Sequence, residues 1–323
     1  MLVESACGEY TDFRIPGMVA TEKGSLLRYC ECRRSVSDWA DIDIKVSRSE
    51  DEGKTWETVH LIESGGNTLN NPVMFVYGNR LILLYCKNYK ELYKCVSDND
   101  GKTFGNSSRV DFESSVSFFF NVVAVGPGHG IVHNGRLLTA AWFAFNKSDP
   151  KSHFPSFSST LYSDDGGESW KVGEPVFRDE IVNGSEGALA VNSDGEVILS
   201  LRHEGEKRTR AIVKSSDGIS GWHSLTFENN LPDPVCMGSM THKGGRIYHI
   251  NCASDNDFKV GGHGKARVDL TVKISDDNFK TYHSIPISGT GGYSDIALLD
   301  NKICVLYEKT RSPFELFFEV IEE

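Results

Sequence analysis

The chain alternates short runs of β-branched and aromatic residues with turns rich in Gly, Asp and Asn. Such runs occupy residues 80–87 (RLILLYCK), 138–145 (LTAAWFAF) and 302–309 (KICVLYEK). A helical period never persists beyond about two turns, whereas an amphipathic helix needs apolar residues every three or four positions. The pattern therefore predicts an all-β protein.

One turn recurs along the chain. It occurs at residues 49–56 (SEDEGKTW) and 163–170 (SDDGGESW), with weaker copies at 97–104 and 275–282 and a degenerate copy starting at Ser215. Successive starts lie 97−49 = 48, 163−97 = 66, 215−163 = 52 and 275−215 = 60 residues apart. Recurrence of four-stranded units at about this spacing is typical of propeller blades. Six units of about 54 residues account for the 323 residues, so we expect one six-bladed β-propeller domain over residues 1–323.

The residues of this turn have structural uses. Ser and Asp side chains can accept hydrogen bonds from backbone amides inside a hairpin turn. Gly adopts positive φ there, and the closing aromatic residue packs into the blade. We therefore interpret the repeated aspartates as scaffold that lies away from the chemistry.

Charge and hydropathy exclude several classes of protein. The net charge of −11 argues against a nucleic-acid partner, which requires basic surface. It does not exclude an anionic substrate bound by a local group of arginines. Apolar runs fall far short of the roughly 20 residues that a bilayer requires, so no membrane insertion is expected. The first residues, MLVESACGEYTDF, lack the apolar core of a signal peptide, which favours a cytoplasmic protein unless a leader has been removed.

The eight cysteines mostly lie in apolar, strand-like segments, and none has zinc-ligand spacing. We expect reduced core cysteines rather than a disulfide framework. Neither a metal nor an organic cofactor is expected, and the oligomeric state is left open.

Residues 13–16 read Phe-Arg-Ile-Pro and are followed within one predicted blade by the first copy of the repeated turn. With these features the chain resembles the sialidase (neuraminidase) family of the bacterial and trypanosomal type, whose hallmarks are the FRIP motif and the Asp-box turn. The resemblance extends to the last strand. It implies a catalytic propeller that removes a terminal α-linked sialic acid from sialylated glycans.

The resemblance implies three arginines for the substrate carboxylate, since a guanidinium makes paired, charge-assisted hydrogen bonds to an anion. Arg14 of FRIP matches the first. Arg202 matches the second, with Arg208 and Arg210 as rivals, and Arg267 matches the third because it precedes an Asp-box-like turn.

It also implies a tyrosine nucleophile, because a carboxylate nucleophile would be repelled by the carboxylate of the substrate. Tyr293, preceded by flexible glycines in GTGGYSD, matches this residue, and Glu186 matches the base that activates it. Glu186 lies 202−186 = 16 residues before Arg202, and Tyr293 lies 308−293 = 15 residues before Glu308. Both gaps are of a hairpin's length and could return each pair to one face.

The remaining assignments lie near the chain ends. Asp38 matches the acid/base, with Asp41 and Asp43 as close rivals, and Glu308 matches the residue that orients Arg14. Arg33, or alternatively Arg34, is expected to add a substrate contact. Trp39 is expected to line the pocket for the N-acyl group.

The expected activity is that of a retaining exo-α-sialidase that forms a covalent sialyl-tyrosine. The alternatives are a trans-sialidase, a hydrolase of another nonulosonic acid such as Kdn, and a propeller that binds sialic acid without catalysis.

Overall fold

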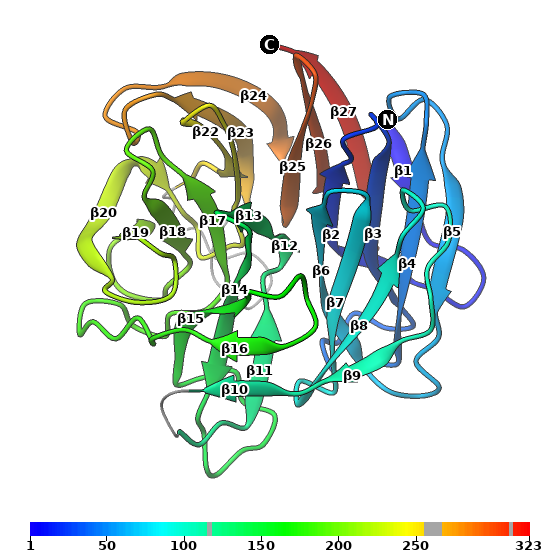
Figure 1. Ribbon diagram of the computed structural model, residues 1–323, viewed down its shortest axis with the longest axis horizontal. Helices are drawn as coiled ribbons and strands as arrows, with labels where there is room; N and C mark the ends of the chain where they lie inside the picture. The colour runs from blue at the N-terminus through cyan, green and yellow to red at the C-terminus, as the bar shows by residue number, and fades with distance from the viewer. Residues whose placement is uncertain (115–117, 255–266, 310–312) are drawn as a thin grey trace.

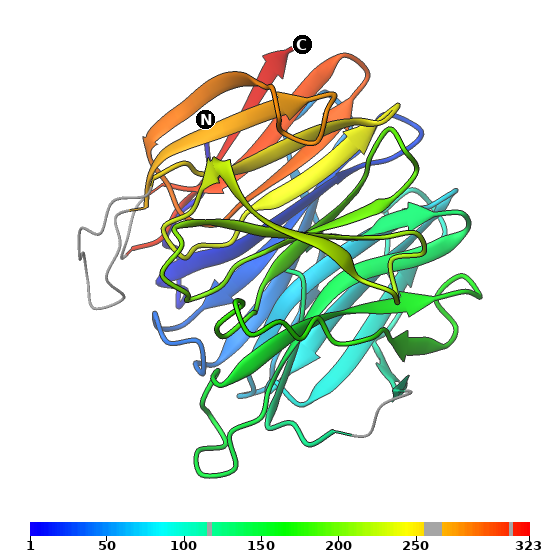
Figure 2. The ribbon, with the colours of Figure 1, turned by 90° about the vertical axis from the view of Figure 1, so that its left-hand side faces the viewer.

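The computed structural model describes residues 1–114, 118–254, 267–309 and 313–323. These residues form 27 strands and no helix, so the all-β prediction is confirmed. None of them forms a helix that could cross a membrane. The strands belong to six sheets, which are antiparallel apart from one short parallel edge pair in each of two sheets. Figure 1 and the view at right angles in Figure 2 show these sheets face to face around a common centre. The chain is a six-bladed β-propeller.

Blades one to five each contain four consecutive strands, to which short edge strands are added in blades two and three, and blade six joins three consecutive strands to the amino-terminal strand. Blade one contains β2 (Asp12–Ala20), β3 (Leu26–Arg33), β4 (Ile42–Ser49) and β5 (Glu57–Ile62). Blade two contains β6 (Leu69–Tyr77), β7 (Arg80–Lys87), β8 (Glu91–Ser97), β9 (Ser108–Val110) and the edge strand β12 (Gly128–His129). Blade three contains β11 (Val122–Val125), β13 (Ile131–His133), β14 (Arg136–Ala144), β15 (Ser156–Ser163), β16 (Trp170–Val172) and β10 (Phe112–Ser114).

The second half of the ring is more regular. Blade four contains β17 (Gly187–Val191), β18 (Val197–Leu201), β19 (Thr209–Ser215) and β20 (His223–Pro232). Blade five contains β21 (Ser239–Lys243), β22 (Arg246–Cys252), β23 (Val268–Ser275) and β24 (His283–Thr290). Blade six contains β25 (Ser294–Leu299), β26 (Lys302–Glu308), β27 (Leu316–Glu322) and, as its outermost strand, β1 (Leu2–Glu4).

Both ends of the chain build blade six. The amino-terminal strand β1 pairs antiparallel with β27, and the backbone nitrogen of Phe318 donates to Met1 O at 2.8 Å. This pairing leaves no gap between the first and last blades, and Figure 1 shows both termini beside this blade.

The hydrophobic core lies between neighbouring blades. Inner strands such as β6 and β26 are buried along most of their length, which explains their nearly continuous apolar sequences, whereas the outer strand β24 is largely exposed. Trp170, the closing aromatic of a repeated turn in blade three, packs 5.5 Å (centroid to centroid) from Phe75 of blade two. A closing aromatic residue therefore packs against the neighbouring blade as well as against its own turn.

The five repeated turns connect the third and fourth strands of blades one to five, and they have the predicted hydrogen bonds. In the first, Ser49 Oγ accepts from the backbone nitrogen of Gly53 at 2.9 Å, and Asp51 Oδ1 accepts from the nitrogen of Thr55 at 2.9 Å. Trp56 Nε1 donates back to Gly53 O at 3.0 Å. Gly53 has φ = 82°, as expected, but in blade five Phe279 takes this position with φ = 66°. Its burial against Met240 and Ile247 accompanies a backbone conformation that glycine would adopt at lower cost.

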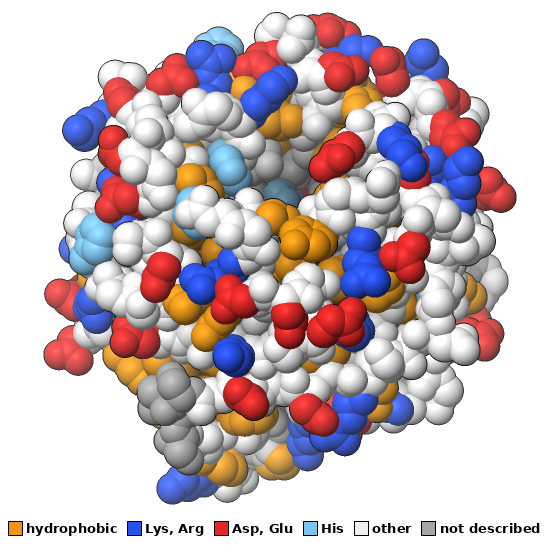
Figure 3. All heavy atoms as spheres, viewed as in Figure 1, with side chains coloured by type: hydrophobic (Ala, Val, Ile, Leu, Met, Phe, Trp, Pro, Cys, Tyr) orange, Lys and Arg blue, Asp and Glu red, His pale blue; other side chains and the backbone are white. Residues whose placement is uncertain are grey.

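A buried carboxylate joins inner strands near the centre of the ring. Asp295 of β25 accepts hydrogen bonds from the nitrogen of Met18 (2.8 Å), Ser239 Oγ (2.5 Å) and His129 Nδ1 (2.8 Å). These groups come from β2, β21 and β12. Figure 3 shows that the face turned to the viewer is hollowed at its centre, with charged side chains of both signs spread around it.

Candidate active site

Three of the predicted site residues bind one another directly. The Tyr293 hydroxyl donates to Glu186 Oε1 at 2.5 Å and accepts from Arg202 Nη1 at 2.8 Å. The same Arg202 nitrogen lies 2.6 Å from Glu186 Oε2. A phenol, a carboxylate and a guanidinium from blades four and six therefore form a closed group.

Strand pairing explains why these side chains meet. Glu186 lies just before β17 and Arg202 just after β18, and the two strands pair with Gly187 opposite Leu201. Tyr293 lies just before β25 and Glu308 is the last residue of β26, and these two strands pair with Ser294 opposite Tyr307. Both predicted hairpin returns are present in the structure.

The Tyr293 hydroxyl is protonated at neutral pH. Burial raises the pKa of the phenol most, and the neighbouring Glu186 carboxylate raises it further. Arg202, Arg267 and Arg14 act in the opposite direction without reversing the shift. A phenol with a raised pKa needs a base to become a nucleophile, and Glu186 is in direct contact to serve as that base.

The three predicted arginines converge on Tyr293 from three blades. Arg14 Cζ and Arg267 Cζ lie 5.2 and 5.3 Å from the centroid of the tyrosine ring, and Arg202 contacts its hydroxyl. Of the rivals to Arg202, Arg210 is fully buried and bound to Asp233, while Arg208 donates to Gly205 O. The structure thus places Arg14, Arg202 and Arg267 together.

The FRIP motif forms an irregularity in β2. The register with β3 shifts between Arg14 and Gly17, and Ile15 has φ = 55°, which is unusual for a β-branched residue. A bulge of this kind redirects a side chain out of the regular alternation of a strand. Strained backbone is characteristic of functional sites, where the surroundings enforce it.

Glu308 enforces this conformation. Its side chain is fully buried and accepts from Arg14 Nε at 3.1 Å, from the nitrogen of Ile15 at 3.1 Å and from the nitrogen of Tyr293 at 3.0 Å. A Cβ on Gly292 would lie 2.4 Å from Glu308 Oε2. Close approach, rather than the flexibility expected from the sequence, therefore accounts for glycine at this position.

Asp38 lies in the loop between β3 and β4, beside two arginines. Its Oδ1 is 2.7 Å from Arg33 Nη1 and 3.6 Å from Arg14 Nη1, and 46% of its side chain is exposed. Partial burial alone would raise the pKa of this carboxyl, but Arg33 and Arg14 outweigh that effect and lower it to about 2. Asp38 is therefore ionised at neutral pH in the unliganded protein.

The rivals to Asp38 have structural partners instead. Asp43 is buried and accepts from the Tyr10 hydroxyl and from Arg34 Nη2, while Asp41 pairs with Arg34 Nη1. Arg34 is thus paired with these two aspartates instead of with Asp38. Arg33 is itself only 1% exposed and is bound by Glu31 and Asp38, so in this structure it positions Asp38, and its contact with substrate stays a prediction.

An aromatic group borders Asp38, and it contains Trp39, which the sequence predicted, together with three residues that the sequence did not reveal. The ring of His153 lies 4.9, 5.4 and 5.9 Å from the rings of Tyr89, Trp142 and Trp39. Burial lowers the pKa of His153, whereas Asp38 and Glu186 act to raise it, so the neutral ring lies within electrostatic reach of both carboxylates. His153 Nε2 and Trp142 Nε1 are buried and have no hydrogen-bond partner among the described residues. Tyr89, Trp142 and His153 come from three separate segments, and nothing in those segments distinguishes these residues from ordinary loop or core residues.

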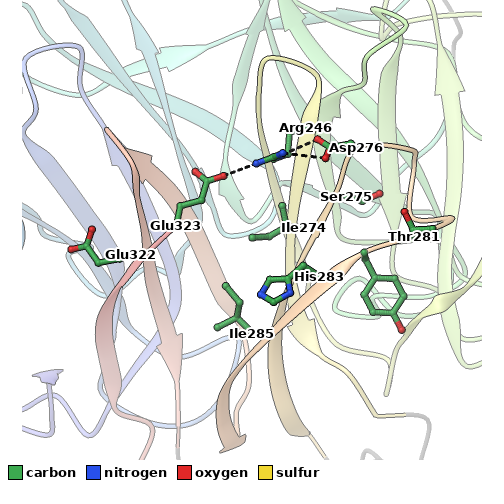
Figure 4. Close-up of a pocket in the computed structure, with 10 residues that line it drawn as sticks. Arg246, Ile274, Ser275, Asp276, Thr281, His283, Ile285, Glu322 and Glu323 are labelled. Atoms are coloured by element: carbon green, nitrogen blue, oxygen red, sulfur yellow. Dashed lines mark hydrogen bonds and ion pairs between the residues drawn. The ribbon is translucent and has the colours of Figure 1, made fainter.

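Other features lie away from this group. Within the described part of the chain, no cluster of three or more His, Cys, Asp or Glu side chains is arranged to bind a metal. The pocket in Figure 4 lies at the edge of blades five and six, where Arg246 bridges Asp276 and Glu323. Part of it is the repeated turn of blade five, and none of the predicted site residues lines it.

The sequence profile of the BNR repeat-like domain matches residues 35–298, which is most of the chain. The chain belongs to this family. Among curated proteins, it is 28% identical to a sialidase of Bacteroides fragilis over 92% of this chain and 60% of that protein. It is 26% identical to a sialidase of Paraclostridium sordellii, over 92% of this chain and 81% of that protein.

Solved structures of sialidases show the same propeller. The Hadza microbial sialidase superposes with a TM-score of 0.81 at 23% identity, covering 97% of this chain and 66% of that one. Trypanosoma rangeli sialidase in complex with 2,3-difluorosialic acid, described as a covalent intermediate, gives a TM-score of 0.76 at 21% identity, covering 96% and 54%. The chain thus spans about half to two thirds of these solved chains. The predicted sialidase resemblance and six-bladed fold are confirmed, and at this identity the solved structures bear on fold alone.

Proposed function

We propose that residues 1–323 form one catalytic domain that hydrolyses terminal α-linked sialic acid from glycans with retention of configuration. The observation that carries the proposal is the contact of one tyrosine hydroxyl with a carboxylate and a guanidinium, inside a ring of three arginines. The related B. fragilis and P. sordellii sialidases support the same substrate class.

The arginines account for recognition of the sugar. A sialic acid carries a carboxylate on its anomeric carbon, and Arg14, Arg202 and Arg267 supply charged donors from three directions. Their convergence next to the Tyr293 hydroxyl would bring the anomeric carbon within reach of this oxygen. The adjacent substrate carboxylate and the phenol oxygen then stabilise positive charge as it develops at that carbon.

In the first step, the Tyr293 oxygen attacks the anomeric carbon while its proton passes to Glu186. The bond to the leaving oxygen breaks, and Asp38 supplies the proton that this oxygen needs. The products are a covalent sialyl-tyrosine and the released glycan. In the second step, water deprotonated by Asp38 attacks the anomeric carbon, the bond to the Tyr293 oxygen breaks, and Glu186 returns the proton to that oxygen. Two inversions give overall retention.

Asp38 must be protonated for the first step, although its pKa in the free protein is about 2. Substrate binding supplies the required change. The substrate carboxylate neutralises Arg14, one of the two arginines that keep the pKa low, and the bound sugar excludes water from a carboxyl that is half exposed when free. Both effects raise the pKa of Asp38 in the complex.

The aromatic group beside Asp38 suggests which sugar is preferred. The side chains of Trp39, Tyr89, Trp142 and His153 offer an apolar surface with two nitrogens that no described residue binds. Such a surface suits a small acyl substituent that carries a carbonyl oxygen. This favours an N-acylated sialic acid over Kdn, which has a hydroxyl in that position. Transfer to a second sugar is kept as an alternative outcome of the assay.

The test is release of 4-methylumbelliferone from its α-Neu5Ac glycoside by wild-type protein and by Tyr293→Phe. Loss of the hydroxyl should lower kcat by at least about 10³-fold. Tyr307→Phe is the matched control, because Tyr307 lies on β26 and its hydroxyl contacts Glu319 instead of Glu186. Equal activity of Tyr293→Phe and wild-type protein would refute the assignment of the nucleophile. Activity on the Kdn glycoside alone would move the proposal to that substrate.

A further inference from the structure

A buried glutamate on strand β3 lies behind the proposed acid/base. Glu31 is fully buried, and its Oε2 accepts from Arg33 Nε at 2.8 Å. On its other side, Arg33 donates from Nη1 to Asp38 Oδ1 at 2.7 Å and to Val36 O at 3.2 Å. The guanidinium of Arg33 thus joins a buried carboxylate to the half-exposed carboxylate of Asp38, and it also binds the backbone of the loop that carries Asp38.

The second oxygen of Glu31 fixes the first strand of the next blade. Glu31 Oε1 accepts from the backbone nitrogen of Asn71 at 2.8 Å. Asn71 has φ = 53° and lies in a register shift between Asn70 and Val73, where β6 pairs with β7. One carboxylate therefore holds Arg33 of its own strand and an irregular backbone segment of the neighbouring blade.

This arrangement resembles the one that Glu308 makes one blade earlier. Glu308 likewise lies on the second strand of its blade, and it accepts from the nitrogen of Ile15 in the irregular first strand of the next blade. Ile15 and Asn71 both have positive φ, and each directly precedes a proline. Each glutamate also binds an arginine, which for Glu308 is Arg14. The repetition indicates that both buried carboxylates organise side chains of the site.

Arg33 lies between two carboxylates with different environments. The side chain of Arg33 is 1% exposed and that of Glu31 is not exposed at all, whereas that of Asp38 is 46% exposed. Burial alone would lower the pKa of Arg33, but Glu31 and Asp38 outweigh that effect and raise it, so the guanidinium stays charged. Glu31 fixes the direction of this guanidinium and opposes part of its charge where that charge acts on Asp38.

We propose that Glu31 is a positioning residue, which holds Arg33 so that Asp38 lies near the leaving oxygen and can carry the proton that this oxygen needs. This inference rests on the proposed function. Without the carboxylate of Glu31, Arg33 would lose the acceptor of its Nε, and its whole charge would act on Asp38. Both changes would impair Asp38 as an acid, the first by displacing it and the second by keeping it ionised.

The first test compares Glu31→Gln with wild-type protein on two substrates. Release of 4-methylumbelliferone needs little help from an acid, whereas the sugar that leaves from sialyllactose needs a proton. We expect kcat/KM to fall at least about 100-fold for sialyllactose and less than about tenfold for the 4-methylumbelliferyl glycoside. Equal losses on both substrates would show a merely structural role for Glu31 and overturn the proposal.

The second test is the pH dependence of kcat for sialyllactose, whose alkaline limb marks the loss of the proton from Asp38. The charged or titratable groups that act on this carboxyl include Arg14, Arg33, Tyr89 and His153. All of them are retained in Glu31→Gln, so loss of the Glu31 charge should lower the pKa of Asp38 in the complex and move the alkaline limb to lower pH. Glu31→Asp retains the charge and should keep the limb at the wild-type pH. The same limb in both variants would contradict the proposal.

Glu4→Gln is the matched control for the loss of a buried carboxylate. Glu4 is also buried and binds Arg28 Nη2 at 3.0 Å, and Arg28 lies 33−28 = 5 residues before Arg33 on the same strand. This variant should be less stable than wild type but have the wild-type substrate preference and pH profile. A shifted alkaline limb in Glu4→Gln would overturn the assignment of that shift to the charge of Glu31.

A stability measurement separates this proposal from the proposed function. Urea unfolding of Glu31→Gln, Asp38→Asn and the double variant requires no substrate. Because both carboxylates bind Arg33, the shift in the urea midpoint of the double variant should differ from the sum of the single shifts. Additive shifts would overturn the link between Glu31 and Asp38. Non-additive shifts in a protein that cleaves no sialoside would support that link and refute the proposed function.

Discussion

Replacing Glu308 by Gln tests whether one buried carboxylate organises the site. The substitution keeps the shape of the side chain and removes its charge. Glu308 accepts from Arg14 and from two backbone nitrogens, those of Ile15 and Tyr293. A glutamine presents an NH2 group in place of one carboxylate oxygen, so at least one of these donors would face another donor. The side chain of Glu308 is fully buried, so water could not take the place of the lost acceptor.

The expected cost follows from these contacts. Removing one partner of a buried ion pair typically costs about 3–5 kcal/mol. Arg14 keeps Asp38 at 3.6 Å, so we expect the lower end of this range, about 3 kcal/mol in the free energy of unfolding. Release of Arg14 and of the Tyr293 backbone should also misplace the substrate carboxylate and lower kcat/KM at least about 100-fold.

The assay is urea unfolding monitored by tryptophan fluorescence, together with kcat/KM for the 4-methylumbelliferyl sialoside. Glu319→Gln is the control, because this carboxylate lies on the adjacent strand β27 and accepts a hydrogen bond from the Tyr307 hydroxyl, away from Arg14 and Tyr293. The free energy of unfolding of this control variant should fall by about 1 kcal/mol, and its kcat/KM should be unchanged. If the free energy of unfolding of Glu308→Gln stayed within about 1 kcal/mol of the wild-type value and its kcat/KM within about threefold, the reasoning about Glu308 would be refuted.

Four further predictions concern Asp38, Asp165 and His153. In Asp38→Ala, kcat/KM should fall about 100-fold more for sialyllactose than for the 4-methylumbelliferyl glycoside, whose leaving group needs no acid, and equal losses would argue against Asp38 as acid. Since the folded pKa of Asp38 is about 2 and its unfolded pKa about 3.9, its ionisation stabilises the fold above about pH 4, and this contribution is lost as the pH falls toward 2. Thermal midpoints of Asp38→Asn measured from pH 5 to pH 2 should therefore fall less steeply than those of wild type, and parallel curves would contradict the low pKa. Asp165→Ala, in the repeated turn of blade three, should lower the thermal midpoint by roughly 2–4 °C with kcat and KM unchanged, whereas a large loss of activity would mean that the turn has a catalytic role. His153→Ala should raise KM for the Neu5Ac glycoside at least about fivefold but leave KM for the Kdn glycoside unchanged, and parallel changes would remove His153 from acyl recognition.

The parts of the fold that the sequence predicted are those set by local interactions. The repeated turn closes through hydrogen bonds between residues two to four apart, such as Ser49, Asp51 and Gly53, so its sequence determines its shape. The returns from Glu186 to Arg202 and from Tyr293 to Glu308 are single hairpins, whose lengths can be counted along the chain.

The remaining parts depend on contacts between distant segments. Strand β1 has three residues and no distinctive pattern, and its pairing with β27 could not be read from either segment. His153 and Trp142 resembled a loop histidine and a core aromatic until the fold placed them beside Asp38.

The contact between Arg14 of blade one and Glu308 of blade six has a consequence for the newly made protein. Arg14 and Glu308 are 294 residues apart, and at about 5–20 residues per second a ribosome needs roughly 15–60 s to synthesise the chain between them. During that interval the FRIP segment has no carboxylate to fix its irregular backbone, and Tyr293 has not yet been made for most of it. An incomplete nascent chain would therefore be inactive however well its first blades had folded, and activity would begin only when the sixth blade joins the first.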